Sequence, residues 1–410
     1  MTVTVPDLVA VPLAVFVGLP ALYLACLAAT TLRRRPVPPR TDRPEGMLRF
    51  AVLIPAHDEE ILVGRTVASA IGLDYPRDRF SVHVIADNCT DATAEIARRY
   101  GACVHVRYEP RKPGKGAALN WLVARVDDEG TRVDAFVIVD ADSELSPNLL
   151  RAMERRLVDG AEAVQALYLV AAAADTPLSR IRRLALQLHN HLRPLAHTSL
   201  GGSSRLYGNG MCLRDALVRD HPWSETSVGE DGELCARLID HGHRIAFAED
   251  ATVSSVMPGS FGDAMSQSLR WERGRFDHFG LYAGLAWKGL TRGDLTRLLC
   301  GVGVVIPPIS FLAACSAFAM LFGVLLPSEP VALVGLGSSL CLLFYVLRGA
   351  ALGGLTARAL FRTLLWAGPY TAWMLWVLVL AALGAGRGDW VRTPRAARSA
   401  PPLEHTFTSD

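Results

Sequence analysis

Two aspartates one residue apart follow an apolar run in the stretch FVIVDADSEL, which covers residues 136–145. Residues two apart in an extended strand point to the same side, so Asp140 and Asp142 could hold one cation together. Hard divalent cations such as Mg²⁺ and Mn²⁺ prefer carboxylate oxygens and leave positions open for phosphate oxygens. The pair therefore predicts a divalent metal site, with a simple polar strand end as the alternative.

Acidic side chains also follow two earlier β-like segments. The sequence IPAHDEE places Asp58 and Glu59 after the first segment, and ADNCTD begins with Asp87 at the end of the second. Carboxylates at neighbouring strand ends could accept hydrogen bonds from the imide and the ribose hydroxyls of a nucleoside. Each of them alone could equally be a helix N-cap or part of a solvated turn. Because three strand ends carry such groups, we expect one shared crevice.

The basic stretch RKPGKGAALN lies between the second and fourth β-like segments. Two glycines surround Lys115 at a predicted helix start, where backbone N–H groups and an ammonium suit a nucleotide or a phosphate. The spacing is not that of a Walker A motif. A basic turn that caps the helix is the alternative interpretation.

Two later stretches contain a candidate base and candidate binding groups for a leaving phosphate. SVGEDGELCARLIDHG places Asp231 just before an amphipathic helix, where a carboxylate could act as a base or as a cap. QSLRWERGR places Gln267, Arg270 and Trp271 on one face of a helix. The arginine could stabilise a departing phosphate and the indole could support a sugar ring. The alternative is a Trp and Arg pair that anchors a helix at a membrane interface.

Strand-like and helix-like segments alternate over residues 48–285 and must position these groups. The runs RFAVLIPA, FSVHVIAD, ACVHV and AFVIVD are each followed by a helix-like stretch. This alternation predicts an α/β domain with a mostly parallel sheet and helices on both faces. Ligands bind outside the carboxyl ends of the strands in such sheets, and the motifs lie at those ends or after them.

Half of the 410 residues are apolar and the formal net charge is +2. This composition favours a membrane-attached enzyme and gives no reason to expect a nucleic-acid partner. Three arginines follow the first apolar run, which predicts that the chain after them faces the cytosol. We expect five regions: an N-terminal transmembrane anchor over 1–35, a linker over 36–47, a cytosolic domain over 48–298, membrane segments over 299–386, and a basic, disordered tail over 387–410.

The sequence gives conflicting signals on the number of spans. Uncharged or nearly uncharged stretches cover residues 8–32, 301–326, 331–347 and 364–383. Four full spans would put the tail outside the cell, whereas the arginines of the tail favour the cytosol. Pro307 and Pro308 make the second stretch the best candidate for a re-entrant segment.

The ordered set IPAHDEE, ADNCTD, KPGKG, DAD, GED and QSLRW resembles the family 2 inverting glycosyltransferases. The resemblance is to their membrane-embedded branch, which includes cellulose, chitin and hyaluronan synthases, and it covers about residues 50–280. It implies a GT-A-like fold with transmembrane helices at both ends. It also implies β-linked transfer from a UDP-sugar to a growing polysaccharide or oligosaccharide at the plasma membrane.

The resemblance also assigns roles to residues. Asp87 matches the position that holds the uridine, and Asp58 with Glu59 stands where the family usually has Asn-Glu. Asp140 and Asp142 match the aspartates that bind UDP and its Mg²⁺ or Mn²⁺, and Asp142 is the more direct ligand. Lys115 matches a basic residue near the nucleotide, and Asp231 matches the general base. Gln267, Arg270 and Trp271 match a signature that binds the diphosphate and the acceptor end.

One base and no second nucleophilic carboxylate among the motifs imply a single displacement with inversion. The expected partners are the UDP-sugar, a saccharide or lipid-linked acceptor, membrane lipid, and a second copy or an export partner. A ceramide glucosyltransferase-like enzyme, which adds one sugar to a lipid, is the main alternative. A non-catalytic membrane scaffold is a weaker alternative, because the acidic residues of the motifs are all present.

Overall fold

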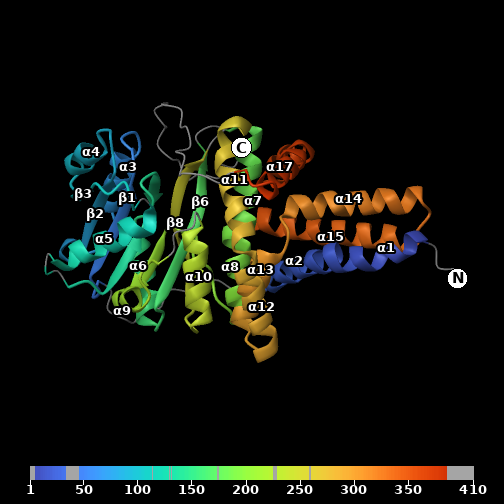
Figure 1. The fold of residues 1–410 in the computed structure, drawn as a ribbon, viewed down its shortest axis with the longest axis horizontal. Coiled ribbons are helices and arrows are strands. Elements are labelled where there is room, and N and C mark those ends of the chain that lie inside the picture. The colour runs from blue at the N-terminus through green and yellow to red at the C-terminus, as the bar shows by residue number, and fades with distance from the viewer. Residues whose placement is uncertain are drawn as a thin grey trace.

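The computed structural model describes residues 5–33, 46–112, 114–128, 130, 132–172, 175–224, 229–257 and 260–385. These residues form two parts that follow one another along the long axis of the molecule (Figure 1). One part is a sheet with helices packed on it. The other part is a set of apolar helices that projects away from the sheet.

Eight strands in the described residues form one sheet, in the order β3-β2-β1-β4-β7-β6-β8-β5. Strands β1, β2, β3 and β4 are parallel, with Phe50 opposite both Phe80 and Ala135. They are the four β-segments that the sequence predicts. The bounds are β1 Phe50–Ala56, β2 Phe80–Asp87, β3 Cys103–Arg107, β4 Ala135–Ile138, β5 Ser143–Leu145, β6 Ala163–Ala172, β7 Met211–Arg214 and β8 Ile245–Met257.

The second half of the sheet differs from the predicted parallel arrangement. β7 is antiparallel to both β4 and β6, and β5 is antiparallel to β8, whereas β6 and β8 are parallel. An antiparallel neighbour needs no crossover helix, so alternating strand-like and helix-like segments do not reveal it. Among the described strands, four of the seven neighbouring pairs are parallel and three are antiparallel, so the sheet is mixed and only its first half is uniformly parallel as predicted.

Helices cover both faces of the sheet, as predicted. On one face, α3 (Val63–Ile71) and α6 (Leu149–Val158) pack on a core that includes Val52 and Ile54 of β1. On the other face, α5 (Lys115–Asp128) and α10 (Glu230–Asp240) pack with Ala51 and Leu53 of the same strand. Alternate residues of a strand point to opposite faces, so a strand covered on both sides is apolar throughout. Two shorter helices complete this part, α4 (Thr93–Arg99) and α9 (Asp215–Asp220).

Long apolar helices form the projecting part. Two helical runs among the described residues are long and apolar enough to cross a membrane, Leu8–Thr30 and α15 (Glu329–Leu352). The first run is formed by α1 (Val5–Leu13), a π-helical turn (Ala14–Gly18) and α2 (Leu19–Thr30). Two bent pairs raise the number to four if each pair is one span. They are α13 (Leu295–Val305) with α14 (Ile309–Leu325), bent by 68°, and α16 (Ala357–Leu364) with α17 (Ala367–Ala382), bent by 50°.

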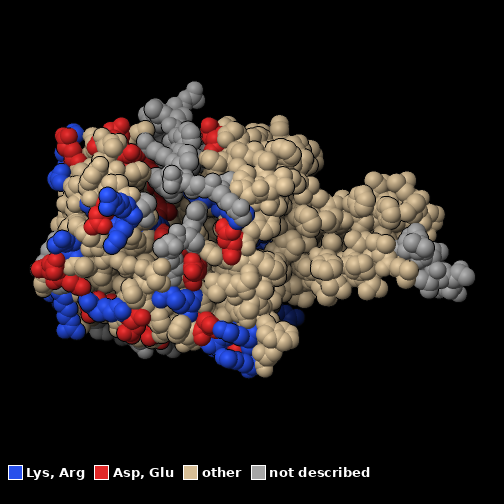
Figure 2. Space-filling view, in the orientation of Figure 1, with Lys and Arg blue, Asp and Glu red and all other residues tan. Residues whose placement is uncertain are grey.

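The first bend lies at Pro307 and Pro308, where the sequence predicts an interruption. Figure 2 shows that Lys, Arg, Asp and Glu side chains gather on the end that contains the sheet, whereas the projecting helices present almost no charge on this face. Residues 36–45 of the predicted linker and the predicted tail over 387–410 lie outside the described residues.

A helical run joins the two parts. α7 (Pro177–Gln187), a π-helical turn (Leu188–Leu192) and α8 (Arg193–Ser199) follow one another between the sheet and the apolar helices (Figure 1). The hydroxyl of Tyr345 on α15 donates to the carbonyl of Leu188 over 2.9 Å, and Arg193 donates to that hydroxyl over 3.1 Å. Tyr23 on α2 contacts the Nε2 atom of His197 at 3.0 Å. Beside this run lie α11 (Phe261–Asp277) and α12 (Phe279–Arg292).

Candidate active site

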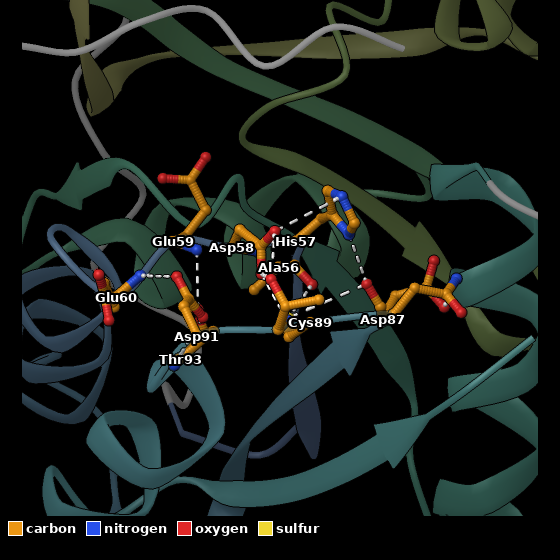
Figure 3. A network of polar contacts seen from close by, with 11 residues as sticks. Ala56, His57, Asp58, Glu59, Glu60, Asp87, Cys89, Asp91 and Thr93 are labelled. Atoms are coloured by element: carbon orange, nitrogen blue, oxygen red, sulfur yellow. Dashed lines mark hydrogen bonds and ion pairs between the residues drawn. The ribbon is translucent and has the colours of Figure 1, made fainter. Parts of the chain in front are cut away.

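The loops after β1 and β2 hold each other at one end of the sheet (Figure 3). Asp58 has a φ of +52°, a backbone conformation that Asp and Asn tolerate better than most residues. Its Oδ1 atom accepts a hydrogen bond of 2.7 Å from the N–H of Thr90. The Nδ1 atom of His57 lies 2.7 Å from the carbonyl oxygen of Asp87. The structure therefore brings Asp58 and Asp87 to the same end of neighbouring strands.

The same loops contain the group of three potential metal ligands found in the described residues: the carboxylates of Asp58 and Asp91 and the thiol of Cys89. Atoms of this group already accept hydrogen bonds from backbone N–H groups of the two loops. Asp91 accepts a 2.9 Å hydrogen bond from the N–H of Thr93, and the N–H of Asp58 donates to Cys89 Sγ over 3.4 Å. The N–H of Glu59 donates to the Thr93 hydroxyl over 2.7 Å, while the Glu59 side chain points away from this network (Figure 3). We therefore interpret the group as a brace between the two loops.

Asp87 is paired with an arginine that the sequence analysis did not identify. Arg107 ends the neighbouring strand β3, and its Nη1 atom lies 2.6 Å from Asp87 Oδ1. The Arg107 side chain is only 2 % exposed. Burial raises the pKa of Asp87, although the hydrogen bond and the charge of Arg107 act in the opposite direction. The pair fixes the Asp87 carboxylate at the strand end.

Lys115, the first residue of α5, connects three segments. Its Nζ atom donates to Asp140 Oδ1 over 2.7 Å and to the carbonyl oxygen of Gly208 over 2.6 Å. Burial is the largest effect on its pKa and acts to lower it. The pKa is nevertheless raised overall, because the carboxylates of Asp140, Asp231 and Glu230 lie nearby. Lys115 is therefore charged and holds these three carboxylates around one cation.

The start of α10 places Asp231 against a tight turn. Gly208 in that turn has a φ of +78°, and a Cβ atom at this position would overlap the Asp231 carboxylate. Glycine therefore provides both the backbone conformation and the space. The adjacent Glu230 accepts a 2.8 Å hydrogen bond from the N–H of Gly116. Burial and the neighbouring Asp231 raise the pKa of Glu230 to about 7.

Asp140 and Asp142 lie beyond β4, which ends at Ile138. Contrary to the prediction from the sequence, the two side chains therefore do not lie on one strand and point the same way, because the chain turns at residues 141–142. The N–H of Asp140 donates to Asn209 Oδ1 over 3.1 Å and fixes this turn. Both carboxylates act on the same neighbour: after burial, the charges of Asp142 and Asp140 raise the pKa of the Tyr168 phenol on β6.

This pair of carboxylates fits a divalent cation. Asp142 is half-buried and lines a small hollow with Arg65 and Glu144. The Asp140 side chain is 38 % exposed and shares its Oδ1 atom with Lys115. Carboxylate oxygens suit Mg²⁺ or Mn²⁺, which takes its other ligands from water and diphosphate oxygens. Asp142 would be the main protein ligand of such a cation, with Asp140 beside it.

The helix α11 carries Gln267, Arg270 and Trp271 within two turns, as the sequence predicts. The Oε1 atom of Gln267 accepts a hydrogen bond of 2.6 Å from Arg182 on α7. The guanidinium carbon of Arg182 lies 5.6 Å from the centre of the Trp271 ring. Trp271 itself is 42 % exposed, so part of its indole is accessible to a ligand.

The same helix touches the start of α10. A Cβ atom on Gly274 of α11 would lie 3.7 Å from the Cα atom of Gly229, the residue before Glu230. The helix that carries Trp271 therefore lies beside the start of the helix that carries Asp231.

The structure thus collects the predicted residues in three adjoining places. Asp58, Glu59 and Asp87 lie at the ends of β1 and β2. Asp140 and Asp231 lie around the Lys115 ammonium, and Asp142 follows Asp140 in the turn after β4. Gln267, Arg270 and Trp271 lie on α11. Sequence reasoning missed the residues that support these groups from outside the motifs: Arg107, Tyr168 and Arg182.

Comparison with known proteins supplies the family. The family model described as glycosyltransferase like family 2 matches residues 48–274, which is more than half of the 410 residues. The chain belongs to this family of glycosyltransferases. The matched region of this family 2 glycosyltransferase begins just before β1 and ends within α11, so it contains every predicted site residue.

Several curated relatives are similar to this family 2 glycosyltransferase. A probable glycosyltransferase, YdaM of Bacillus subtilis, is 25 % identical over 247 residues, which cover 58 % of each chain. A beta-monoglucosyldiacylglycerol synthase of Nostoc is 28 % identical over 47 % of this chain and 42 % of its own. Glucomannan 4-beta-mannosyltransferase 1 of Oryza sativa is 26 % identical over 65 % of this chain and 55 % of its own. The chain thus spans about half the length of these relatives.

A solved structure supports the fold. The mannosyltransferase PcManGT from Pyrobaculum calidifontis, in complex with GDP-Man and Mn²⁺, matches 93 % of this chain and 100 % of its own with a TM-score of 0.60. The sequence identity is 18 %, so the match shows a shared fold alone. The GT-A-like fold expected from the motif order is confirmed.

Proposed function

We propose that this chain is a membrane-integrated, inverting β-glycosyltransferase that transfers a sugar from a UDP-sugar to a growing polysaccharide or oligosaccharide and uses Mg²⁺ or Mn²⁺. The observation that carries this proposal is the contact of Lys115 with Asp140 and with the Gly208 turn that supports Asp231. It joins the expected donor-binding groups and the expected base in one place. Family membership supports sugar transfer.

The donor would bind across the strand ends. Asp58, Glu59 and Asp87 would hold the uridine, and Lys115 would contact the diphosphate. A divalent cation on Asp142 and Asp140 supplies, when bound, positive charge that compensates the diphosphate oxygens. Arg270 and Lys115 would stabilise the charge that develops on the departing UDP. Gln267 would support the same side from α11.

The acceptor hydroxyl would attack the anomeric carbon while Asp231 takes its proton. The bond from the anomeric carbon to the diphosphate oxygen breaks in the same step, so the configuration inverts and an α-linked donor gives a β-linked product. The exposed face of Trp271 would align the acceptor ring, and alignment of this kind contributes strongly to the rate.

Transfer of one sugar to a lipid acceptor is the second candidate, and a specific contact favours it. The Phe261 ring on α11 lies 5.3 Å from the Trp373 ring on α17, and Arg273 on α11 donates to the carbonyl of Ala381 over 3.4 Å. The helix that would receive the acceptor, α11, therefore adjoins the apolar helix α17, along which a lipid could approach. The similarity to beta-monoglucosyldiacylglycerol synthases supports the same candidate.

We further propose a location in the plasma membrane with several spans and a cytosolic catalytic domain. The apolar helices Leu8–Thr30 and α15, and the arginines that follow the first of them, support this orientation. Membrane lipid would surround the projecting helices. Synthesis of a long polymer would also need an export path, which a second copy of the chain or a partner protein could complete.

Product analysis tests the proposed function. The full-length protein in lipid nanodiscs would be given Mn²⁺ and a panel of radiolabelled UDP-sugars, and the products would be divided into polymer and organic-extractable fractions. Label in polymer from one donor supports the saccharide acceptor, and label only in the lipid fraction supports the second candidate. Absence of transfer from every UDP-sugar, in the presence of both kinds of acceptor, would contradict the proposed donor.

A further inference from the structure

Arg182 lies in α7 and is almost completely buried, with 4 % of its surface exposed. Its helix is well anchored. Thr176 and Ser179 form a capping box at the start of α7, and Ile181 packs with Ala264 of α11 in one apolar cluster. The backbone that carries Arg182 is therefore held in a fixed relation to α11.

The guanidinium of Arg182 contacts two motif residues at once. Its Nη2 atom donates to Gln267 Oε1 over 2.6 Å and lies 3.7 Å from the sulfur of Met257. Its guanidinium carbon lies 5.6 Å from the centre of the Trp271 ring, within the range of a cation–π interaction. A planar guanidinium can donate hydrogen bonds in its plane and stack through its face. Arg182 donates a hydrogen bond to Gln267 and packs against the ring of Trp271, about one turn further along α11.

The surroundings do not compensate the charge of Arg182. Within the part of the chain that the structure describes, its Nη1 atom has no hydrogen-bond partner and no carboxylate forms an ion pair with it. Burial lowers the pKa of this arginine. A buried charge without a counter-charge destabilises a fold, and a well-packed apolar residue of similar size is often neutral or stabilising in its place. Arg182 is therefore poorly explained as a residue that maintains the fold.

The Tyr168 side chain on β6 is electrostatically coupled both to Arg182 and to the aspartates of the DAD stretch. The Tyr168 phenol is close enough to Asp140 and Asp142 for both to raise its pKa, and it acts on Arg182 in turn. The carbonyl of Tyr168 accepts a hydrogen bond of 3.1 Å from Asn190, in the π-helical turn that continues α7.

We propose that Arg182 is a positioning residue for the transfer reaction, which holds the Gln267 amide and the Trp271 indole in the orientation that receives the substrate. This inference rests on the proposed function, because it assumes that α11 contacts the diphosphate and the acceptor. Arg182 then contributes to the rate while it lowers the stability of the fold. A merely structural residue would contribute to both together.

The test compares Arg182→Met with a matched variant, Arg180→Met, in the full-length protein in nanodiscs. Arg180 lies on the same helix but is paired with Asp175 at 3.4 Å. We expect Arg182→Met to lower kcat about ten- to a hundredfold, because small misplacements of positioning groups have effects of this size. Its melting temperature should be unchanged or higher. Arg180→Met should keep the wild-type kcat.

A double-mutant comparison separates positioning from a general effect. If Arg182 acts through Gln267, adding Arg182→Met to Gln267→Ala should change kcat much less than Arg182→Met does alone. Arg182→Lys should recover part of the rate, because a lysine keeps the charge and the hydrogen bond but not the stacked plane. A wild-type kcat for Arg182→Met would overturn the inference. So would a loss of kcat that is matched by a fall in melting temperature and is fully additive with Gln267→Ala.

A readout without transfer keeps this inference separate from the proposed function. The fluorescence of Trp271, obtained as the difference between each protein and its Trp271→Phe version, should become more accessible to acrylamide in Arg182→Met. Unchanged quenching would overturn the positioning role even if transfer is confirmed. If the wild type transfers no sugar but Arg182→Met still shows the increased quenching, the proposed function is contradicted while the contact between Arg182 and Trp271 remains supported.

Discussion

The ammonium of Lys115 donates a hydrogen bond of 2.7 Å to the carboxylate of Asp140, the first aspartate of the DAD stretch. The two residues come from the start of α5 and from the turn after β4, and the same ammonium also binds the Gly208 carbonyl. One charge therefore connects the donor side of the site to the turn that supports Asp231.

Replacing Lys115 by methionine should lower the rate of transfer about a hundred- to a thousandfold, which is typical for removal of a cationic or hydrogen-bonding group at a site of developing negative charge. The methionine keeps much of the side-chain length but leaves Asp140, Glu230 and Asp231 without their shared cation. Initial rates with the preferred UDP-sugar measure the effect. Lys112→Met removes an exposed lysine from the same stretch and is the control. Equal losses in both variants would show that Lys115 has no special role.

Gly208→Ala should displace the Asp231 carboxylate and reduce transfer at least a hundredfold, since the added methyl group occupies its position. Gly201→Ala is a matched control, because Gly201 has the same φ of +78° and nothing lies within 4 Å of the added Cβ atom. Each alanine costs about 1–2 kcal/mol in backbone conformation. Similar melting temperatures with a rate loss in only Gly208→Ala are expected. A comparable rate loss in Gly201→Ala would assign the effect to backbone strain.

Glu230 should make the stability depend on pH. Its pKa in the folded protein is about 7, above the ordinary value of 4.5, so the folded state binds the proton more tightly than the unfolded state. The stabilising contribution is complete below about pH 4.5 and is lost as the pH rises toward 7. Glu230→Gln should therefore show a smaller fall in melting temperature than the wild type over this window. Identical slopes for the two proteins would contradict the raised pKa.

Removal of divalent cations by a chelator should stop transfer, and Mn²⁺ or Mg²⁺ should restore it. Asp142→Ala should not be restored at the same concentration of cation. Glu144→Gln changes another carboxylate of the same hollow and should respond like the wild type. Full activity of the wild type in excess chelator would show that transfer does not require a divalent cation at these aspartates.

Much of this site could be predicted because its groups follow strands that are easy to recognise. The ends of β1, β2 and β4 carry Asp58, Asp87 and Asp140, and parallel neighbours bring such ends together. The two glycines of KPGKG indicated the start of α5 from the local sequence alone, without reference to distant residues. The QSLRW helix was predicted from its spacing in the same way.

The rest depends on contacts between segments far apart in the chain. Arg182 meets Gln267 across 85 positions, and Arg107 meets Asp87 across 20. Neither arginine belongs to a motif, because each is placed by the neighbouring helix or strand and not by its spacing from other residues in the sequence. The antiparallel strand β7 was missed for the same reason. The strand argument for Asp140 and Asp142 failed because β4 ends two residues before the first of them.

The role of Asp231 is the central claim, and Asp231→Asn tests it most directly. The asparagine keeps the shape of the side chain beside Gly208 but cannot take up the proton of the acceptor. Transfer from the preferred UDP-sugar should fall about a hundred- to ten-thousandfold, while UDP binding and the melting temperature stay close to those of the wild type. Transfer by Asp231→Asn at a rate near that of the wild type would contradict the account.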